Sequence, residues 1–197
     1  TFYMPKYAGI EVDTGLPMWY AEKDGQTVVT TAYSEASNYL CGDPTPDVYG
    51  GFGTSMVLGA FDISMQFSYS VGGLVYDSGY ASLMSPPGTS TGTNIHRNML
   101  FAWTPENKEA PIPRFQYLDE NIAAQSDRFL TDASFLNFQS AQIGYTLPRS
   151  LTERFNVSRM RIYVLCDNIH YWSARKGLDP RYSFTGTTNY AVNSPVR

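Results

Sequence analysis

One short motif places a reactive residue type in a setting that known chemistry uses. Asp13-Thr14-Gly15 matches the triplet around the catalytic aspartate of aspartic proteases, whose mechanism needs two carboxylates that share a proton. The sequence holds no second Asp-Thr-Gly, and Pro17 follows closely, so a loop turn explains the triplet better. Neither a nucleophile-elbow motif nor the paired carboxylates of a glycosidase can be identified. We therefore expect no enzymatic activity.

The sequence also gives little reason to expect a metal ion or cofactor. His96 and His170 have no cysteine or carboxylate cluster at ligand spacing, so we interpret them as ordinary loop and strand residues. Asp43 and Asp47 could contribute to a calcium site, but turn residues around two prolines explain them equally well. We expect no cofactor and no metal ion, and the sequence leaves calcium in the loops open.

Aromatic side chains are the more informative set, because Phe, Trp and Tyr make up 15% of the chain and many lie in turn-rich segments. Rings offer flat contact area at low entropic cost, which suits sugar faces or peptide side chains. For any single ring, packing of the loops against themselves or against a partner protein is the better explanation. The candidate contacts to a substrate or partner are Tyr76, Tyr80, Phe101, Trp103, Phe115, Tyr117, Trp172 and Tyr182.

Composition excludes several classes of protein. The 197 residues suit one domain, only 16% are charged, and the net charge of −4 provides no basic surface for nucleic acid. No apolar run approaches the roughly 20 residues of a transmembrane helix, and the first ten residues show no secretion signal. Cys41 and Cys166 are far apart, which favours two isolated thiols and leaves a single disulfide open.

Strand periodicity recurs in four segments. Between Phe61 and Val71 six apolar residues alternate with polar ones, and a weaker strand precedes them with only Gly59 and Ala60 between, which predicts a tight hairpin. Ser150 to Phe155 is interpreted as one helical turn with Ser150 as its cap and Glu153 as capping-box partner. The expected strands are 49–58, 61–71, 135–147 and 160–171.

The strands suit either of two all-β architectures. Eleven residues at about 3.3 Å each, tilted by about 45°, rise roughly 25 Å, which matches the apolar band of an outer-membrane barrel. In that case Phe61, Ile63, Met65, Phe67 and Tyr69 face lipid, and Asp62, Ser64, Gln66 and Ser68 face the lumen. The alternative is a soluble β-sandwich, whose apolar face packs on a second sheet. Long turn-rich stretches that alternate with short connections, the small polar residues of the opposite face and the rings near the strand ends favour the barrel.

Five segments, in order along the chain, resemble the SusC/RagA family of TonB-dependent outer-membrane transporters. The first is Tyr7 to Ile10 with Asp13 to Tyr20, and the second is Gly42 to Pro46 leading to Tyr49-Gly50-Gly51-Phe52-Gly53. The others are Val71 to Asp77, Phe135 to Pro148, and Arg161 to Val164 with Asp167-Asn168-Ile169 and Lys176-Gly177-Leu178-Asp179-Pro180.

The resemblance implies an antiparallel transmembrane β-barrel segment: about four full strands of a roughly 22-stranded barrel, with long extracellular loops. Four strands cannot close a barrel, so we expect the carboxyl-terminal part of one barrel domain. Its expected parts are an extracellular loop 1–48, a hairpin 49–71, a long extracellular loop 72–134, two strands with a periplasmic turn 135–172, and an extracellular loop 173–197.

The resemblance further implies an importer of oligosaccharides or oligopeptides in the bacterial outer membrane. Its expected partners are the rest of the barrel and its plug, a SusD-like surface lipoprotein, TonB, outer-membrane lipid and the substrate. No nucleic acid is expected. A secreted β-sandwich that binds glycans is the alternative function, and an extracellular hydrolase is a third.

Overall fold

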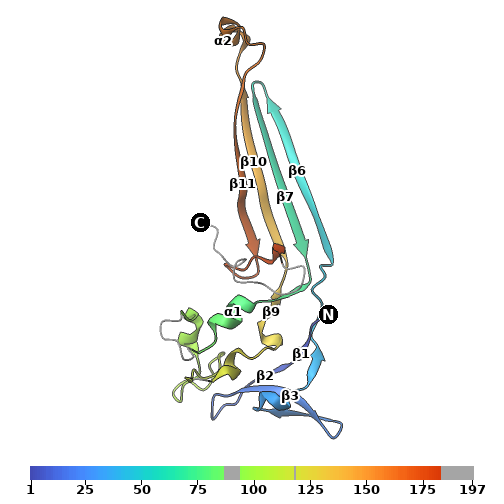
Figure 1. Ribbon diagram of the computed structural model, residues 1–197, viewed down its shortest axis with the longest axis vertical. Coiled ribbons are helices and arrows are strands. Elements are labelled where there is room, and N and C mark those ends of the chain that lie inside the picture. Colours follow the sequence, from blue (N-terminus) through green and yellow to red (C-terminus); the bar gives the residue numbers. More distant parts are fainter. Residues whose placement is uncertain (87–93, 118, 183–197) are drawn as a thin grey trace.

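A long four-stranded antiparallel sheet dominates the computed structural model, which describes residues 1–86, 94–117 and 119–182. The spatial order of the strands is β11-β10-β7-β6. In Figure 1 this sheet forms an extended ribbon above a lobe of shorter elements. Its strands are β6 (Val48–Leu58), β7 (Phe61–Val71), β10 (Phe135–Thr146) and β11 (Arg161–Ser173). The four predicted strands are thus confirmed, with ends that differ by one or two residues.

A tight turn joins the first two strands of the sheet. Leu58 pairs with Phe61, so only Gly59 and Ala60 lie between the strands, as the sequence predicted. Gly59 has φ +63°, a left-handed conformation that a residue without Cβ adopts without strain. We call the end of the sheet at this turn the turn end, and the opposite end, where β7 leads into Gly72, the loop end.

A β-bulge interrupts the middle of the sheet, and no local pattern in the sequence indicates it. The register of β10 against both neighbours shifts between Phe138 and Ser140, while Asn168 on β11 has φ +51°. The extra residue on β10 changes which side chains share a face. As a result Leu136 and Phe138 lie on the same face as Ala141, although each is an odd number of residues away from it.

The remaining elements build a lobe at the loop end, which we call the loop lobe and define as the described residues of 1–47 and 73–134. It holds its own apolar cluster, in which Met84, Ile122 and Phe129 are almost completely buried. The expected irregular loops therefore contain regular structure. The elements are β1 (Tyr3–Pro5), β2 (Tyr7–Ile10), β3 (Pro17–Lys23), β4 (Gln26–Thr30), η1 (Tyr33–Glu35), β5 (Asn38–Leu40), β8 (Leu74–Tyr76), α1 (Ser78–Leu83), η2 (Arg97–Phe101), η3 (Glu120–Ala123), η4 (Asp127–Phe129) and β9 (Leu130–Asp132).

Short strand pairs hold the loop lobe together. The pairings are β1 with β5, β2 with β3 and β4, and β8 with β9, all antiparallel. The pairing of Leu74 with Asp132 closes the base of the long segment between β7 and β10. Among the described residues no helix is long and apolar enough to cross a membrane.

One helical turn lies at the turn end, beyond the strands (Figure 1). It consists of α2 (Arg149–Thr152) and η5 (Glu153–Phe155), which confirms the predicted turn. The predicted cap is wrong, because the helix begins at Arg149 with Pro148 as its N-cap residue and has no side-chain cap. Ser150 therefore lies inside the first turn, where its hydroxyl is not at a capping position. The last element is η6 (Pro180–Tyr182).

Candidate functional site

The two faces of the sheet differ in chemistry. Residues directly opposite each other on neighbouring strands point to the same face, so the register assigns every side chain. The apolar face carries Phe61, Ile63, Met65, Phe67 and Tyr69 together with their partners on β6, β10 and β11. The polar face carries Asp62, Ser64, Gln66 and Ser68.

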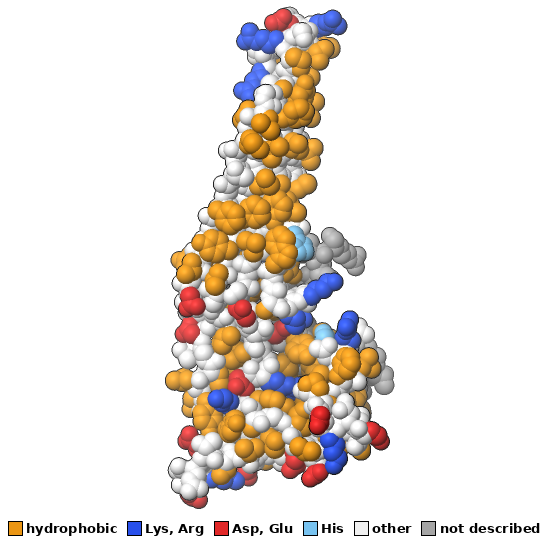
Figure 2. All heavy atoms as spheres, turned by 180° about the vertical axis from the view of Figure 1, so that it is seen from behind, with side chains coloured by type: hydrophobic (Ala, Val, Ile, Leu, Met, Phe, Trp, Pro, Cys, Tyr) orange, Lys and Arg blue, Asp and Glu red, His pale blue; other side chains and the backbone are white. Residues whose placement is uncertain are grey.

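Stacked rings run across the apolar face. Phe67 stacks on Phe52 with ring centroids 5.0 Å apart and on Phe138 at 4.5 Å, so three strands share one row. The face is nevertheless open: Phe52 is 54% exposed and Val164 is 60% exposed. Figure 2 shows hydrophobic side chains along most of the ribbon. No second sheet covers this face within the described part of the chain, which removes the main feature of the sandwich alternative.

An ion pair crosses the polar face near the turn end. The Arg161 guanidinium binds the Asp62 carboxylate, with Nε 2.9 Å from Oδ1, and also lies over the Tyr163 ring. Gly144 lies directly beneath this pair, because a Cβ there would be 2.4 Å from Arg161 Nη2 and 2.6 Å from Asp62 Oδ1. The absence of a side chain at position 144 thus makes room for the ion pair.

A second polar group lies on the same face at the loop end. Arg181 donates to Asn137 Oδ1 at 2.9 Å and to both oxygens of the almost fully buried Asp179, and it stacks on Tyr171. Asn137 in turn donates to Ser68 at 3.3 Å. A hollow of about 520 Å³ lies here, bordered by Pro44, Tyr49, Ser68, Phe135 and Arg181.

The aromatic candidates in the long segment fall into two groups. Tyr76 and Tyr80 pack edge-on against Phe129 and belong to the core of the loop lobe. Burial raises the pKa of Tyr76 to about 12, so its phenol stays neutral at physiological pH. Three candidates lie at the surface, with exposed fractions of 60%, 41% and 61%: Phe101, Phe115 and Tyr117.

The other three candidates have different surroundings. Trp103 is partly buried, and its indole N–H donates to the Val12 carbonyl at 3.1 Å. Trp172 pairs with Leu136, which pairs with Tyr69, so Trp172 lies on the apolar face and apart from the loop rings. The side chain of Tyr182 lies outside what the structure describes.

The Asp13-Thr14-Gly15 triplet is confirmed as a turn, and it fastens two segments together. Gly15 has φ +72°, and a Cβ there would be 2.4 Å from the Trp103 ring. Its carbonyl accepts from the Arg114 N–H at 2.8 Å, and Asp13 pairs with Lys108 at 3.1 Å. These contacts join the β2–β3 connection to the segment around residues 103–114.

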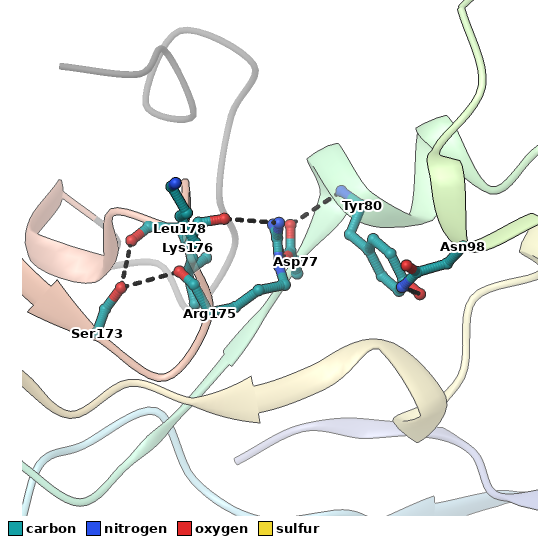
Figure 3. A network of polar contacts seen from close by, with 7 residues as sticks. All are labelled: Asp77, Tyr80, Asn98, Ser173, Arg175, Lys176 and Leu178. Carbon is teal, nitrogen blue, oxygen red and sulfur yellow. Dashed lines mark hydrogen bonds and ion pairs between the residues drawn. The ribbon is translucent and has the colours of Figure 1, made fainter. Parts of the chain in front are cut away.

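A network centred on Asp77 joins the loop lobe to the segment that follows β11 (Figure 3). Asp77 is 3% exposed; it accepts from the Tyr80 N–H at 2.9 Å and from Arg175 Nε at 2.7 Å. Tyr80 continues the network, since its hydroxyl accepts from Asn98 Nδ2 at 3.0 Å. Ser173 closes the turn by donating to the carbonyls of Arg175 and Leu178.

His96 borders this network as a neutral imidazole. Burial, together with the nearby Arg175 and Arg97, lowers the pKa of His96 below its usual value. Its Nδ1 accepts from the Asn98 N–H at 3.2 Å, which requires that nitrogen to be unprotonated. His96 thus acts as a structural acceptor. His170 lies in β11, as expected, with its ring 4.6 Å from that of Trp172.

Other candidates for chemistry remain isolated. Within the described ranges no three His, Cys, Asp or Glu residues gather as metal ligands would. Asp43 instead accepts from the Thr45 side chain and N–H, which lowers its pKa to about 2. Cys41 and Cys166 are both free thiols.

Sequence reasoning missed the charged residues that organise this site: Asp77, Arg175, Asp179 and Arg181. A usable signal exists in hindsight, because so few residues are charged and two of these arginines flank the Lys176 to Pro180 stretch. Isolated charges in turn-rich segments of an apolar chain tend to be paired.

Comparisons with known proteins agree with this geometry. The chain is 28% identical over 177 residues to TonB-dependent receptor P3 of Formosa agariphila and 23% identical over 167 residues to TonB-dependent receptor P26 of the same organism. These matches cover 90% and 85% of the chain but 16% of each relative, so the chain spans about a sixth of their length. No protein-family model matches the chain.

Solved structures give the same result. The chain superimposes on a RagAB peptide transporter with a TM-score of 0.71 and 28% identity. Against the RagAB peptide importer in its 'open-open' state the TM-score is 0.73 with 29% identity, and each match covers 91% of this chain and about a fifth of the other. The chain is a SusC/RagA-like segment of a TonB-dependent transporter.

In this SusC/RagA-like segment the five stretches of resemblance occupy defined places. Tyr49 to Gly53 lies in β6 at the loop end, and the stretch from Phe135 supplies β10. Lys176 to Pro180 forms the turn whose flanking arginines bind Asp77 and Asp179. The motifs therefore mark strand entries and the contacts between the sheet and the loop lobe.

Proposed function

We propose that this chain forms part of the wall and mouth of a TonB-dependent importer in the bacterial outer membrane. The observation that carries the proposal is the sheet itself: four long antiparallel strands with an open apolar face and an opposite polar face. Strands of 11 to 13 residues have the length needed to cross the apolar core of a bilayer when tilted.

In this proposal the apolar face, with Ile63 and Phe67, contacts lipid, and the polar face, with Ser64 and Ser68, lines the lumen. The two edges, β6 and β11, pair with further strands of a roughly 22-stranded barrel, because an unpaired edge in lipid leaves backbone groups without partners. A soluble sheet with so much open apolar surface would instead aggregate.

The proposed cargo is an oligopeptide or oligosaccharide, captured with a SusD-like surface lipoprotein and driven through TonB. The loop end is the proposed extracellular side, so residues 1–48, 72–134 and 173–197 surround the mouth. Support comes from the hollow beside Tyr49, Phe135 and Arg181 on the lumen side of the loop end. The exposed Phe101, Phe115 and Tyr117 are the proposed contacts to substrate or lipoprotein. No step of covalent chemistry is involved.

Cysteine labelling in the complete transporter tests the face assignment. In a background with Cys41 and Cys166 replaced by serine, single cysteines at 63, 65 and 67 should react slowly with a bulky water-soluble maleimide, and those at 64, 66 and 68 should react fast. Equal rates for the two sets would overturn the barrel assignment. Uptake is tested separately, by growth of a strain without the transporter or without TonB on peptides or glycans as sole nutrient.

A further inference from the structure

The helical turn at the turn end carries exposed apolar side chains. Residues 148–160 extend beyond the strands (Figure 1), and we call them the tip. Leu151 is 49% exposed, Phe155 is 75% exposed and Met160 is 39% exposed. Neighbouring apolar side chains on a surface turn indicate a contact with something outside the chain.

The tip is also cationic. It carries Arg149, Arg154 and Arg159 against a single acid, Glu153. In the described part of the chain none of the three guanidinium groups has a carboxylate within 4 Å, whereas the Arg161 side chain next to them is neutralised by Asp62. Figure 2 shows basic side chains gathered at this end, directly beyond the hydrophobic band of the sheet.

The apolar face of the sheet continues up to the tip. The last row of that face consists of Leu58, Phe61, Tyr145 and Ile162, which lie opposite one another on the four strands. At the same end an open hollow of about 800 Å³ is lined by Phe61, by Val57 and the Asp62–Arg161 pair of the polar face, and by Arg159. Arg159 thus shares this hollow with Phe61 of the last apolar row and with the Asp62–Arg161 pair.

We propose that the tip binds the phosphate headgroups of anionic phospholipids at the membrane surface. The inference rests on the proposed function, which assigns the adjoining apolar face to lipid. Arginines that flank an apolar band lie at the depth of lipid headgroups, and each cation near an anionic surface adds attraction. Leu151 and Phe155 enter the interface beside the headgroups, as apolar residues of interfacial helices do. A site for a soluble anion would not need these exposed apolar side chains.

The test uses the complete transporter in nanodiscs of phosphatidylcholine, with spin-labelled phosphatidylglycerol or phosphatidylcholine as the probe. The native protein should retain more immobilised phosphatidylglycerol than phosphatidylcholine. In the triple variant Arg149→Gln, Arg154→Gln, Arg159→Gln this preference should fall about tenfold, which is less than the roughly 100-fold that three cations could contribute at about fivefold each. The matched control Arg97→Gln, Lys108→Gln, Lys176→Gln removes as much charge from the loop end and should keep the preference.

An unchanged preference in the tip variant would overturn the inference, and so would displacement of the labelled lipid by millimolar glycerol 3-phosphate. Phe155→Ser should weaken retention of both lipids. Heat-dependent mobility on gels confirms that each variant assembles. If the cysteines at 63, 65 and 67 reacted as fast as those at 64, 66 and 68, the proposed function would fail together with this inference. If they reacted slowly but the native protein showed no preference for phosphatidylglycerol, only the role of the tip would fail.

Discussion

Replacing Asp77 by asparagine should release the segment after β11 from the loop lobe. The carboxylate is 3% exposed and is the ion-pair partner of Arg175, which is 32% exposed. Loss of a buried pair costs about 3–5 kcal/mol and loss of an exposed pair about 0–1 kcal/mol. Because one partner is a third exposed, we expect the free energy of local opening to fall by about 2 kcal/mol, which is roughly a 30-fold rise in the open population.

Asparagine is the informative substitution at this position. Its side-chain oxygen still accepts from the Tyr80 N–H and caps α1, so the variant removes the ion pair and keeps the cap. Arg175→Gln should have the larger effect, because it leaves the carboxylate buried and uncompensated. The double variant should be less destabilised than the sum of the two single changes.

Hydrogen exchange of the complete transporter, followed on peptides from α1 and from residues 173–180, measures this opening. Lys23→Gln is the control. The side chains of the Lys23–Glu35 pair are 55% and 47% exposed, so its loss should raise local opening less than about fivefold. Native-like exchange at both segments in Asp77→Asn would refute the reasoning. So would an effect of equal size in the control.

Three further outcomes follow from single contacts. Gly144→Val should displace Arg161 from Asp62 and lower the temperature at which the assembled barrel loses its compact mobility on gels. Gly59→Ala should lower it less, because nothing lies within 4 Å of its added Cβ and only the backbone strain of a side chain at φ +63° remains. Gly15→Ala should speed exchange at residues 11–16 more than Gly25→Ala does at its own turn, because both glycines have φ near +70° but only Gly15 lies against Trp103; equal effects would refute a role for Trp103. The pKa of Asp43 is depressed to about 2 in the folded chain, so its contacts to Thr45 should persist above pH 4 and weaken as the pH falls through 2. Hydrogen exchange of the Thr45 amide, corrected for its intrinsic pH dependence, measures this weakening.

The sequence by itself determined the strands and the turn between the first two. Alternation with period two is a local property, since each side chain points to the opposite face from its neighbour, so Phe61 to Val71 could be assigned without knowing its partners. Gly59 and Ala60 likewise specify a tight connection through local backbone preferences. The resemblance to SusC/RagA transporters rests on such local stretches as well.

Tertiary structure alone decided how these pieces combine. The bulge near Phe138 is a feature of the pairing of β10 with its neighbours, and it places Phe138 beside Phe67. The burial of Tyr80 and the pairing of Asp77 with Arg175 depend on contacts between residues far apart in the chain. Local patterns carry no information on such contacts, because their free energy arises only when distant segments exclude water from one another.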